Sequence, residues 1–322
     1  MIRPAYMIGL ALVAGGCVLP FVTEGYTIYS MTRLLALAIA IAGVNLLTGV
    51  AGLFSIGQSA FFALGAYAVG IGGQQLGLSP YLCLPLAALW GGLLGFGFGW
   101  PAARLSAVHL ALLTWGLAIS LPRVLKSTWL EDWTGGVQGL YLERPGAPVW
   151  TGLTDDQWWW FVTLAITLAV FVMLDNVLRS RWGRAFRAAR DQPLAASSMG
   201  VHVGYYRALA FAVSGAVTAV AGAITGLLDD FVAPDAYSVF FSITLLVGAV
   251  AGGIHSLAGA LVGAVMLAVL SSLSQGLSQY IAFPIYGFVL IGLIMLAPRG
   301  VTPQFERLLR WLSGRLTQGR RG

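Results

Sequence analysis

The sequence predicts an all-α integral membrane protein with about ten transmembrane helices. Hydrophobic residues make up 58% of its 322 residues and charged residues only 9%, whereas about 25% of the residues in an average soluble domain are charged. Residues 34–103 and 236–298 contain no Asp, Glu, Lys or Arg. Because a membrane helix needs about 20 mostly apolar residues, each of these two tracts is long enough for three crossings.

Four shorter apolar tracts, each long enough for one crossing, complete the expected number. They are residues 4–23, 105–122, 157–174 and 208–228. We expect the first to remain as a helix, since no small-x-small cleavage site of a signal peptide follows it. A transmembrane β-barrel would require alternating apolar and polar residues, and continuous apolar runs such as residues 34–41 argue against it.

Clusters of glycine, proline and polar residues divide the two long tracts into their expected spans. They lie at residues 49–52, 72–80, 248–259 and 275–284. Glycine-rich breaks in corresponding tracts point to an internally repeated transporter whose path lies between the repeats. The alternative is that such breaks only let helices pack closely.

The distribution of basic residues predicts one orientation in the membrane. If the N-terminus is cytoplasmic, the spans place Arg3, Arg104 and the arginines of residues 179–207 and 299–321 on the cytoplasmic side. Lys and Arg concentrate on that side of membrane proteins, so both termini are expected there. The net charge of +6 is therefore a topology signal and does not indicate nucleic-acid binding.

We expect one transmembrane domain over residues 1–322, with three hydrophilic segments. These are a periplasmic loop at 127–156, a cytoplasmic loop at 178–206 and a basic cytoplasmic tail at 299–322. Tryptophans gather in and just after the first loop, at Trp129, Trp133, Trp150 and residues 158–160. Tryptophan is typical of the membrane–water interface, so we expect these side chains to form an interfacial belt.

The motifs of the common hydrolytic and metal-dependent enzymes are missing. The sequence has no G-x-x-x-x-G-K-[ST], no zinc-binding histidine pair and no G-x-S-x-G. Cys17 and Cys83 are too few for a disulfide framework or a metal site. We therefore expect no catalytic residue, cofactor or metal ion in this chain.

The cytoplasmic loop has the pattern of a docking element. Arg184, Arg187 and Arg190 recur every three residues, and Asp191-Gln192-Pro193 resembles a helix start. Gly200 would end this helix after about two turns. A short helix with small residues on one side fits a groove on another protein. The alternative is that the arginines only set the topology and hold lipid headgroups.

Polar residues beside the first glycine break are candidates for lining a path. Ser55, Gln58 and Ser59 would be costly if they faced lipid, so we expect them to face protein or water. In the second tract, His255 occupies the comparable break. The alternative is that both segments are helix-packing seams.

Four motifs, in order along nearly the whole chain, resemble one family. Residues 52–67 (GLFSIGQSAFFALGAY) are similar to its first signature, residues 134–139 (TGGVQG) to its external-loop motif and residues 298–300 (PRG) to its closing one. Ala195-Ala196-x-x-x-Gly200 matches part of the motif by which importer permeases dock onto their ATPases. The chain thus resembles the LivM-type permeases of branched-chain amino-acid ABC transporters. It departs from them at Leu194, which replaces the usual glutamate, at Gln58, where histidine is common, and at His255, where a small residue is usual.

The resemblance implies an ABC importer permease fold with broken helices and a short cytoplasmic coupling helix, in a bacterial inner membrane. The implied partners are a second permease subunit, two cytoplasmic ATPases that bind ATP and Mg²⁺, and a periplasmic binding protein that delivers branched-chain or other apolar amino acids. The residues expected to contact the ATPases are Arg184, Arg187, Arg190, Asp191, Ala195, Ala196 and Gly200. Those expected on the translocation path are Ser55, Gln58, Ser59 and His255.

Two alternatives stay open at the level of sequence. Related permeases import urea, amides or aromatic acids, so the substrate is less determined than the mechanism. A stand-alone secondary transporter or channel is the other alternative. Ion-coupled carriers generally bind the coupling ion through intramembrane acids or histidines, and the deep apolar tracts contain no Asp or Glu.

Overall fold

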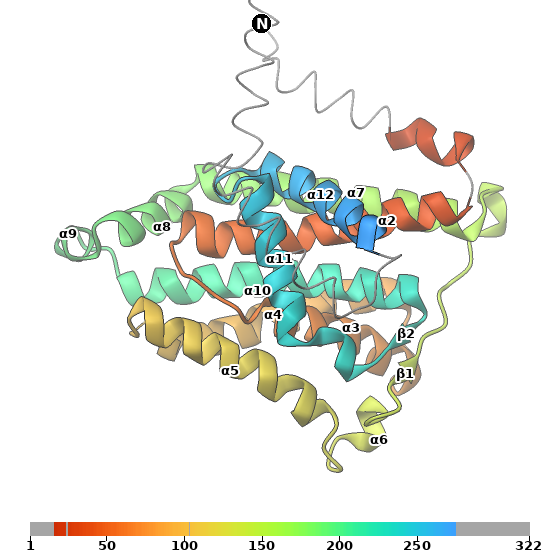
Figure 1. Cartoon of the computed structure of the whole chain (residues 1–322), viewed down its shortest axis with the longest axis horizontal. Helices are drawn as coiled ribbons and strands as arrows, with labels where there is room; N and C mark the ends of the chain where they lie inside the picture. The colour runs from red at the N-terminus through yellow and green to blue at the C-terminus, as the bar shows by residue number, and fades with distance from the viewer. Residues whose placement is uncertain (1–15, 24, 103, 275–322) are drawn as a thin grey trace, which may run out of the picture.

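The computed structural model describes residues 16–23, 25–102 and 104–274, and this part of the chain is a bundle of helices (Figure 1). Residues 16–22 are helical. The longer helices are α2 (Gly25–Val44), α3 (Gln58–Gln74), α4 (Pro80–Ala102), α5 (Ala107–Leu125), α7 (Asp155–Arg179), α10 (Val203–Asp229), α11 (Val239–Gly252) and α12 (Leu257–Ser274). The shorter ones are the π-helix η1 (Asn45–Val50), α6 (Glu131–Thr134), α8 (Arg181–Asp191), α9 (Pro193–Ser198) and the 3-10 helices η2 (Val149–Thr151) and η3 (Pro234–Tyr237). The predicted all-α class is confirmed.

The predicted number of ten spans is not confirmed. The described residues contain five helices long and apolar enough to cross a membrane, namely Gly25–Val50, α4, α5, α7 and α10. α11 has 14 residues, or about 21 Å at 1.5 Å per residue, which is shorter than the roughly 30 Å hydrocarbon core. It is bent by 119° from α12, so this pair is one broken span or a re-entrant loop. Most of the first expected span, the break at 275–284, the last span and the tail lie outside the described residues.

α10 is the central helix and packs against α2, α3 and α4 (Figure 1). Its contact with α4 is close because α4 carries glycine at every fourth position, at Gly91, Gly95 and Gly99. A Cβ atom on Gly95 would lie only 2.6 Å from the carbonyl oxygen of Phe211 on α10. Small residues at this spacing let membrane helices approach to backbone contact. α5 and α7 lie further out and leave apolar faces exposed, as contact with lipid requires.

The two ends of the bundle differ in composition. α8 and α9 project at one end, whereas α6 and the strands lie at the other (Figure 1). There, β1 (Leu140–Tyr141) pairs antiparallel with β2 (Phe231–Val232). The same end holds the ion pairs Arg33–Asp229, Lys126–Asp235 and Arg144–Asp156. The predicted periplasmic and cytoplasmic loops thus lie at opposite ends of the bundle.

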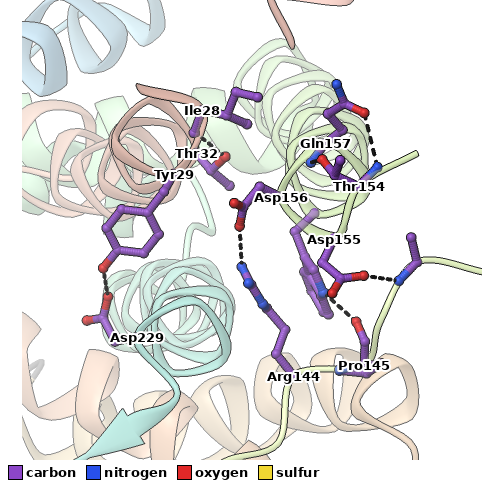
Figure 2. Close-up of polar contacts among 12 residues, drawn as sticks. Ile28, Tyr29, Thr32, Arg144, Pro145, Thr154, Asp155, Asp156, Gln157 and Asp229 are labelled. Atoms are coloured by element: carbon purple, nitrogen blue, oxygen red, sulfur yellow. Dashed lines mark hydrogen bonds and ion pairs between the residues drawn. The ribbon is translucent and has the colours of Figure 1, made fainter. Parts of the chain in front are cut away.

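The loop at residues 127–156 is fastened to the start of α7 (Figure 2). Nη1 of Arg144 lies 3.0 Å from Oδ1 of Asp156, and the indole of Trp159 donates a 2.9 Å hydrogen bond to the carbonyl oxygen of Pro145. Thr154 and Gln157 form a capping box on α7. The expected interfacial belt is therefore wrong for Trp159 and also for Trp160, because both are buried and hold other segments of the chain.

Candidate functional site

The first glycine break separates two helices, as predicted. α2 continues into η1, which ends at Val50, and α3 begins at Gln58. Gly52 has a φ of +69°, a left-handed conformation that glycine adopts without steric cost. Residues 51–57 therefore leave the helical path between the two helices and carry Ser55 to the start of α3.

Gln58 lies at the centre of a buried polar seam between α3 and α10. Its side chain is 1% exposed, and its Nε2 donates a 3.0 Å hydrogen bond to Oγ of Ser214. The hydroxyl of Thr218 donates a 2.9 Å bond to Oε1 of Gln58. Ser214 in turn donates to the carbonyl oxygen of Gly43 on α2, at 2.8 Å. Gln58 and Ser214 together thus link three helices of the bundle, α3, α10 and α2.

The seam continues on both sides of Gln58. The backbone N–H of Ser59 donates to Oγ of Ser242 on α11, and the Ser242 hydroxyl donates to Oγ of Ser59, both at 2.8 Å. Ser55 is buried and accepts from the N–H of Gly57 at 3.2 Å, while the N–H of Ile56 donates to Oγ1 of Thr114 on α5 at 3.1 Å. The groups named here are neutral hydroxyls, amides and backbone atoms. The seam is closed in this conformation, with each polar group bound to a neighbour.

Sequence reasoning found one side of this seam and missed the other. Ser55, Gln58 and Ser59 were singled out, but their partners Ser214, Thr218, Ser242 and Thr114 were not. Ser214 and Thr218 are one helical turn apart, so they share a face of α10. Two hydroxyls at this spacing in an apolar span indicate a polar face on α10, which is the sequence pattern that predicts these partners.

The second glycine break contacts the first. Ser256 lies in the second break, between α11 and α12. Its carbonyl oxygen accepts a 2.9 Å hydrogen bond from the side-chain amide of Asn45 in η1. A Cβ atom on Gly49 would lie 1.8 Å from the carbonyl oxygen of Ile254, so only glycine fits there. The paired breaks therefore lie against each other. His255 is exposed in this turn, away from the buried groups around Gln58.

Arg184, Arg187 and Arg190, in the loop that the sequence predicts to be cytoplasmic, each donate to a backbone carbonyl at the end of a helix. Arg184 donates to the carbonyl of Arg179 and Arg187 to that of Leu178, both at 3.2 Å, in the last turn of α7. Arg190 donates through Nη1 to the carbonyl of Gly49, at 2.7 Å. Cationic side chains satisfy such terminal carbonyls and interact favourably with the helix dipole. A second hydrogen bond, from Nε of Arg190 to Oδ1 of Asp191 at 2.7 Å, lowers the pKa of the Asp191 carboxyl.

The α9 turn presents apolar side chains at the tip of this loop. Leu194 and Met199 are 87% and 85% exposed, whereas Ala196 is only 6% exposed and packs within the chain. Gly200 has a φ of +83°, and no heavy atom lies within 4 Å of the position where its Cβ would be. It borders a cavity of about 550 Å³ between α9, the start of α10 and the end of α4, lined by Trp100, Arg104, Ser197, His202 and Tyr205 among others. The predicted helix from Pro193 is present, and the exposed Leu194 and Met199 are the residues that the sequence did not single out for contact.

Comparison with known proteins gives the family. A family model described as the permease component of branched-chain amino acid transport systems matches residues 26–298. The chain belongs to this family. The expectation that it is a membrane-embedded transport component, and not an enzyme, is thereby confirmed.

Several relatives resemble this permease over most of its length. The LivM permease protein of a high-affinity branched-chain amino acid transport system in Salmonella typhimurium is 27% identical, covering 95% of this chain and 76% of its own length. A probable LivH branched-chain amino acid permease of Methanocaldococcus jannaschii is 26% identical, over 91% of this chain and 95% of its own length. The LsrC permease of an autoinducer 2 import system in an Enterobacter strain is 28% identical, over 79% of this chain and 70% of its own length. No solved structure matches this permease.

Proposed function

We propose that this permease is one membrane subunit of an ATP-driven ABC importer for branched-chain or other apolar amino acids. It works with a second permease subunit, two ATPases that bind ATP and Mg²⁺, and a periplasmic binding protein. α8 and α9 face the cytoplasm in this arrangement, and the loop at 127–156 faces the periplasm. The similarity to the two Liv permeases supports the substrate class.

The exposed α9 turn is the structural observation that carries the proposal. An apolar side chain on a hydrophilic loop has no lipid to contact, so the exposure of Leu194 and Met199 fits a partner protein. Pro193 starts the helix, and Gly200 leaves open space beside the cavity. The ATPase contact therefore centres on Leu194, Ala195, Met199 and Gly200. Arg184, Arg187 and Ala196 support this turn from within the chain.

The buried seam is the proposed place where the path opens. Among the described residues, the hydrogen-bond partners of Ser55, Gln58 and Ser59 are neutral groups of α10 and α11 or of their own turn, so opening these bonds leaves no charge unpaired. A neutral lining binds a zwitterionic amino acid weakly, and selectivity resides mainly in the binding protein. His255 lies in the second break, whose neighbouring residues contact η1. In this proposal it lines the path when the two breaks move apart during transport.

A second candidate is an importer of another small polar solute. The similarity to LsrC, a permease of an autoinducer 2 import system, favours it, because the same chain architecture serves a different substrate there. Uptake assays with valine, isoleucine, leucine, autoinducer 2, urea and aromatic acids separate the two candidates.

Co-expression with the proposed partners tests the function. The complex, solubilised in detergent, is expected to retain an ATPase through this chain and, in liposomes with the binding protein, to accumulate a branched-chain amino acid only when ATP is supplied. The permease alone is expected to show neither ATP hydrolysis nor accumulation. Accumulation by the permease alone, driven by a proton or sodium gradient, would show that it is a secondary transporter.

A further inference from the structure

We propose that Arg190 is a positioning residue that transmits movement of the α8–α9 loop to the break between η1 and α3. This inference rests on the proposed function, in which an ATPase moves that loop. It gives Arg190 a role inside the permease, in place of the direct ATPase contact that its sequence position suggested.

Arg190 holds a carbonyl that its own helix leaves free. The N–H of Ala51 bonds to the carbonyl of Leu46, and the N–H of Leu53 bonds to that of Leu47. At the end of η1, the carbonyl of Gly49 instead accepts the 2.7 Å hydrogen bond from Nη1 of Arg190. Because a charged donor makes a stronger hydrogen bond than a neutral one, this contact fixes the helix end to α8.

The stem of Arg190 also lies directly on the turn that follows. A Cβ atom on Gly52 would be 2.3 Å from Cγ of Arg190 and 2.8 Å from its Cδ. Asp191 accepts a 2.7 Å hydrogen bond from Nε and so holds the guanidinium in this orientation. Gly52 starts the segment that leads to Ser55 and Gln58, so Arg190 contacts the chain immediately before the polar seam.

α8 packs against α7 and α10, which lets it carry the displacement as one helix. Phe186 and Ala189 are buried on its inner face, and the ring of Phe186 meets that of Tyr206 on α10 with centroids 6.3 Å apart. Only Gln192 separates α8 from α9. Arg184 and Arg187 fasten the earlier part of α8 to the end of α7. A push on α9 therefore turns α8 about its attachment to α7 and moves Arg190, which pulls on Gly49 and Gly52.

Two arginine variants in the full complex test this assignment. Arg190→Ala is expected to keep the retained ATPase and its basal hydrolysis while lowering uptake, and the stimulation of hydrolysis by the loaded binding protein, by about tenfold, the factor that one charge-assisted hydrogen bond is worth. Arg181→Ala is the control, since it removes an exposed arginine of the same helix that has no part in this mechanism, and a change of less than about threefold is expected for such a solvated charge. Arg190→Lys keeps a charged donor and should restore part of the coupling. Stimulation per assembled complex is the decisive measurement, because a merely structural role would lower abundance and leave this ratio unchanged.

A substitution at Gly52 tests the contact itself. Gly52→Ala introduces both the strain of a positive φ and the clash with Cγ and Cδ of Arg190. In an Arg190→Ala background that clash is gone, and the strain and a 3.2 Å contact with the Cβ atom of residue 190 remain. The loss of thermal stability caused by Gly52→Ala should therefore be clearly smaller in that background, and equal losses in both backgrounds would overturn the contact. If Arg190→Ala releases the ATPase, or leaves uptake and stimulation at the level of the unaltered complex, the transmitting role is wrong. If the unaltered complex itself neither retains an ATPase nor transports, the proposed function is overturned, and this inference with it.

Discussion

Replacing Gln58 with leucine removes the link between α3 and α10 while keeping a side chain of similar size. The hydroxyl of Thr218 loses its acceptor and Ser214 loses the donor that it binds, although Ser214 keeps its bond to the carbonyl of Gly43. The side chains of all three residues at 58, 214 and 218 are 1% exposed or less, so water cannot replace the missing partner without opening the bundle.

The expected cost follows from the two lost bonds. Side-chain hydrogen bonds between membrane helices average about 0.6 kcal/mol and reach about 1.7 kcal/mol, so the closed seam should lose roughly 1–3 kcal/mol. Since 1.4 kcal/mol is about tenfold in an equilibrium constant, the balance between closed and open seam shifts by roughly five- to a hundredfold. A transport cycle that must pass through the closed seam then runs more slowly, and the open path loses an amide that could bind a polar substrate.

Uptake of leucine, isoleucine and valine by the reconstituted complex measures this effect, with membrane abundance as the check on folding. We expect uptake to fall about tenfold and the order of preference among the three amino acids to stay the same, because the seam holds no charge that distinguishes them. Thr225→Val is the matched control, since Thr225 is a buried hydroxyl of the same helix that bonds only within α10, to the carbonyl of Ala221. Normal uptake by Gln58→Leu, or a changed order of preference, would refute the placement of Gln58 on the path.

Three further substitutions test other parts of the structure. Gly200→Trp should reduce the amount of ATPase retained, because it places an indole in the docking surface or its cavity. Gly200→Ala carries only the cost of about 1–2 kcal/mol for a left-handed residue and should retain the ATPase. Equal retention by both variants would argue against docking at this turn. Gly95→Val should lower the stability of the solubilised protein by about 1–3 kcal/mol, because its side chain meets the Phe211 carbonyl of α10. Gly97→Val, on the open side of α4, should have little effect, and thermal unfolding of both variants measures the difference. Burial raises the pKa of the Asp230 carboxyl in the folded protein, so its ionised form opposes folding above the folded-state pKa and ceases to do so below the pKa of the unfolded chain. Asp230→Asn should therefore be more stable than the unaltered protein at pH 8, with a difference that shrinks toward pH 4. A difference independent of pH would exclude the carboxyl as its cause.

Features that depend on local composition could be predicted from the sequence. The breaks at residues 49–52 and 72–80 and the helices α5, α7 and α10 appear close to their expected places, since glycine, proline and apolar runs act within a few residues. The number of ten spans is not confirmed, since several of the expected spans lie outside the described residues. Hydropathy also records that residues 236–274 are apolar but not that the chain bends by 119° there. Three tryptophans in a row look alike in sequence, yet Trp159 and Trp160 are buried by contacts with distant segments.

Residues of the candidate site could be predicted where the pattern lies within one segment of the sequence. Contacts between segments that are distant in the sequence could not. The polar residues at 55, 58 and 59 stand out in an apolar tract, but their partners lie on α10, α11 and α5. In α8 the regular spacing of Arg184, Arg187 and Arg190 indicates a docking element, and the structure adds that Phe186 and Ala189 lie on its buried face. The bond from Arg190 to Gly49 joins residues 141 positions apart, and no local pattern indicates such a pairing.

The glycine face of α4 has a consequence for the synthesis of this protein. Its partner α10 begins only at residue 203, and a ribosome that adds about 5–20 residues per second needs roughly 5–20 s after completing α4 to produce it. During that interval α2, α3 and α4 are already in the bilayer without the helix that binds them together. Gly91, Gly95 and Gly99 then expose bare backbone to lipid or to a chaperone, and the N-terminal half has only its own contacts, such as that between α3 and α4. A chain truncated before α10 should therefore insert normally and yet be degraded rapidly, because the last helix of the central packing arrives last.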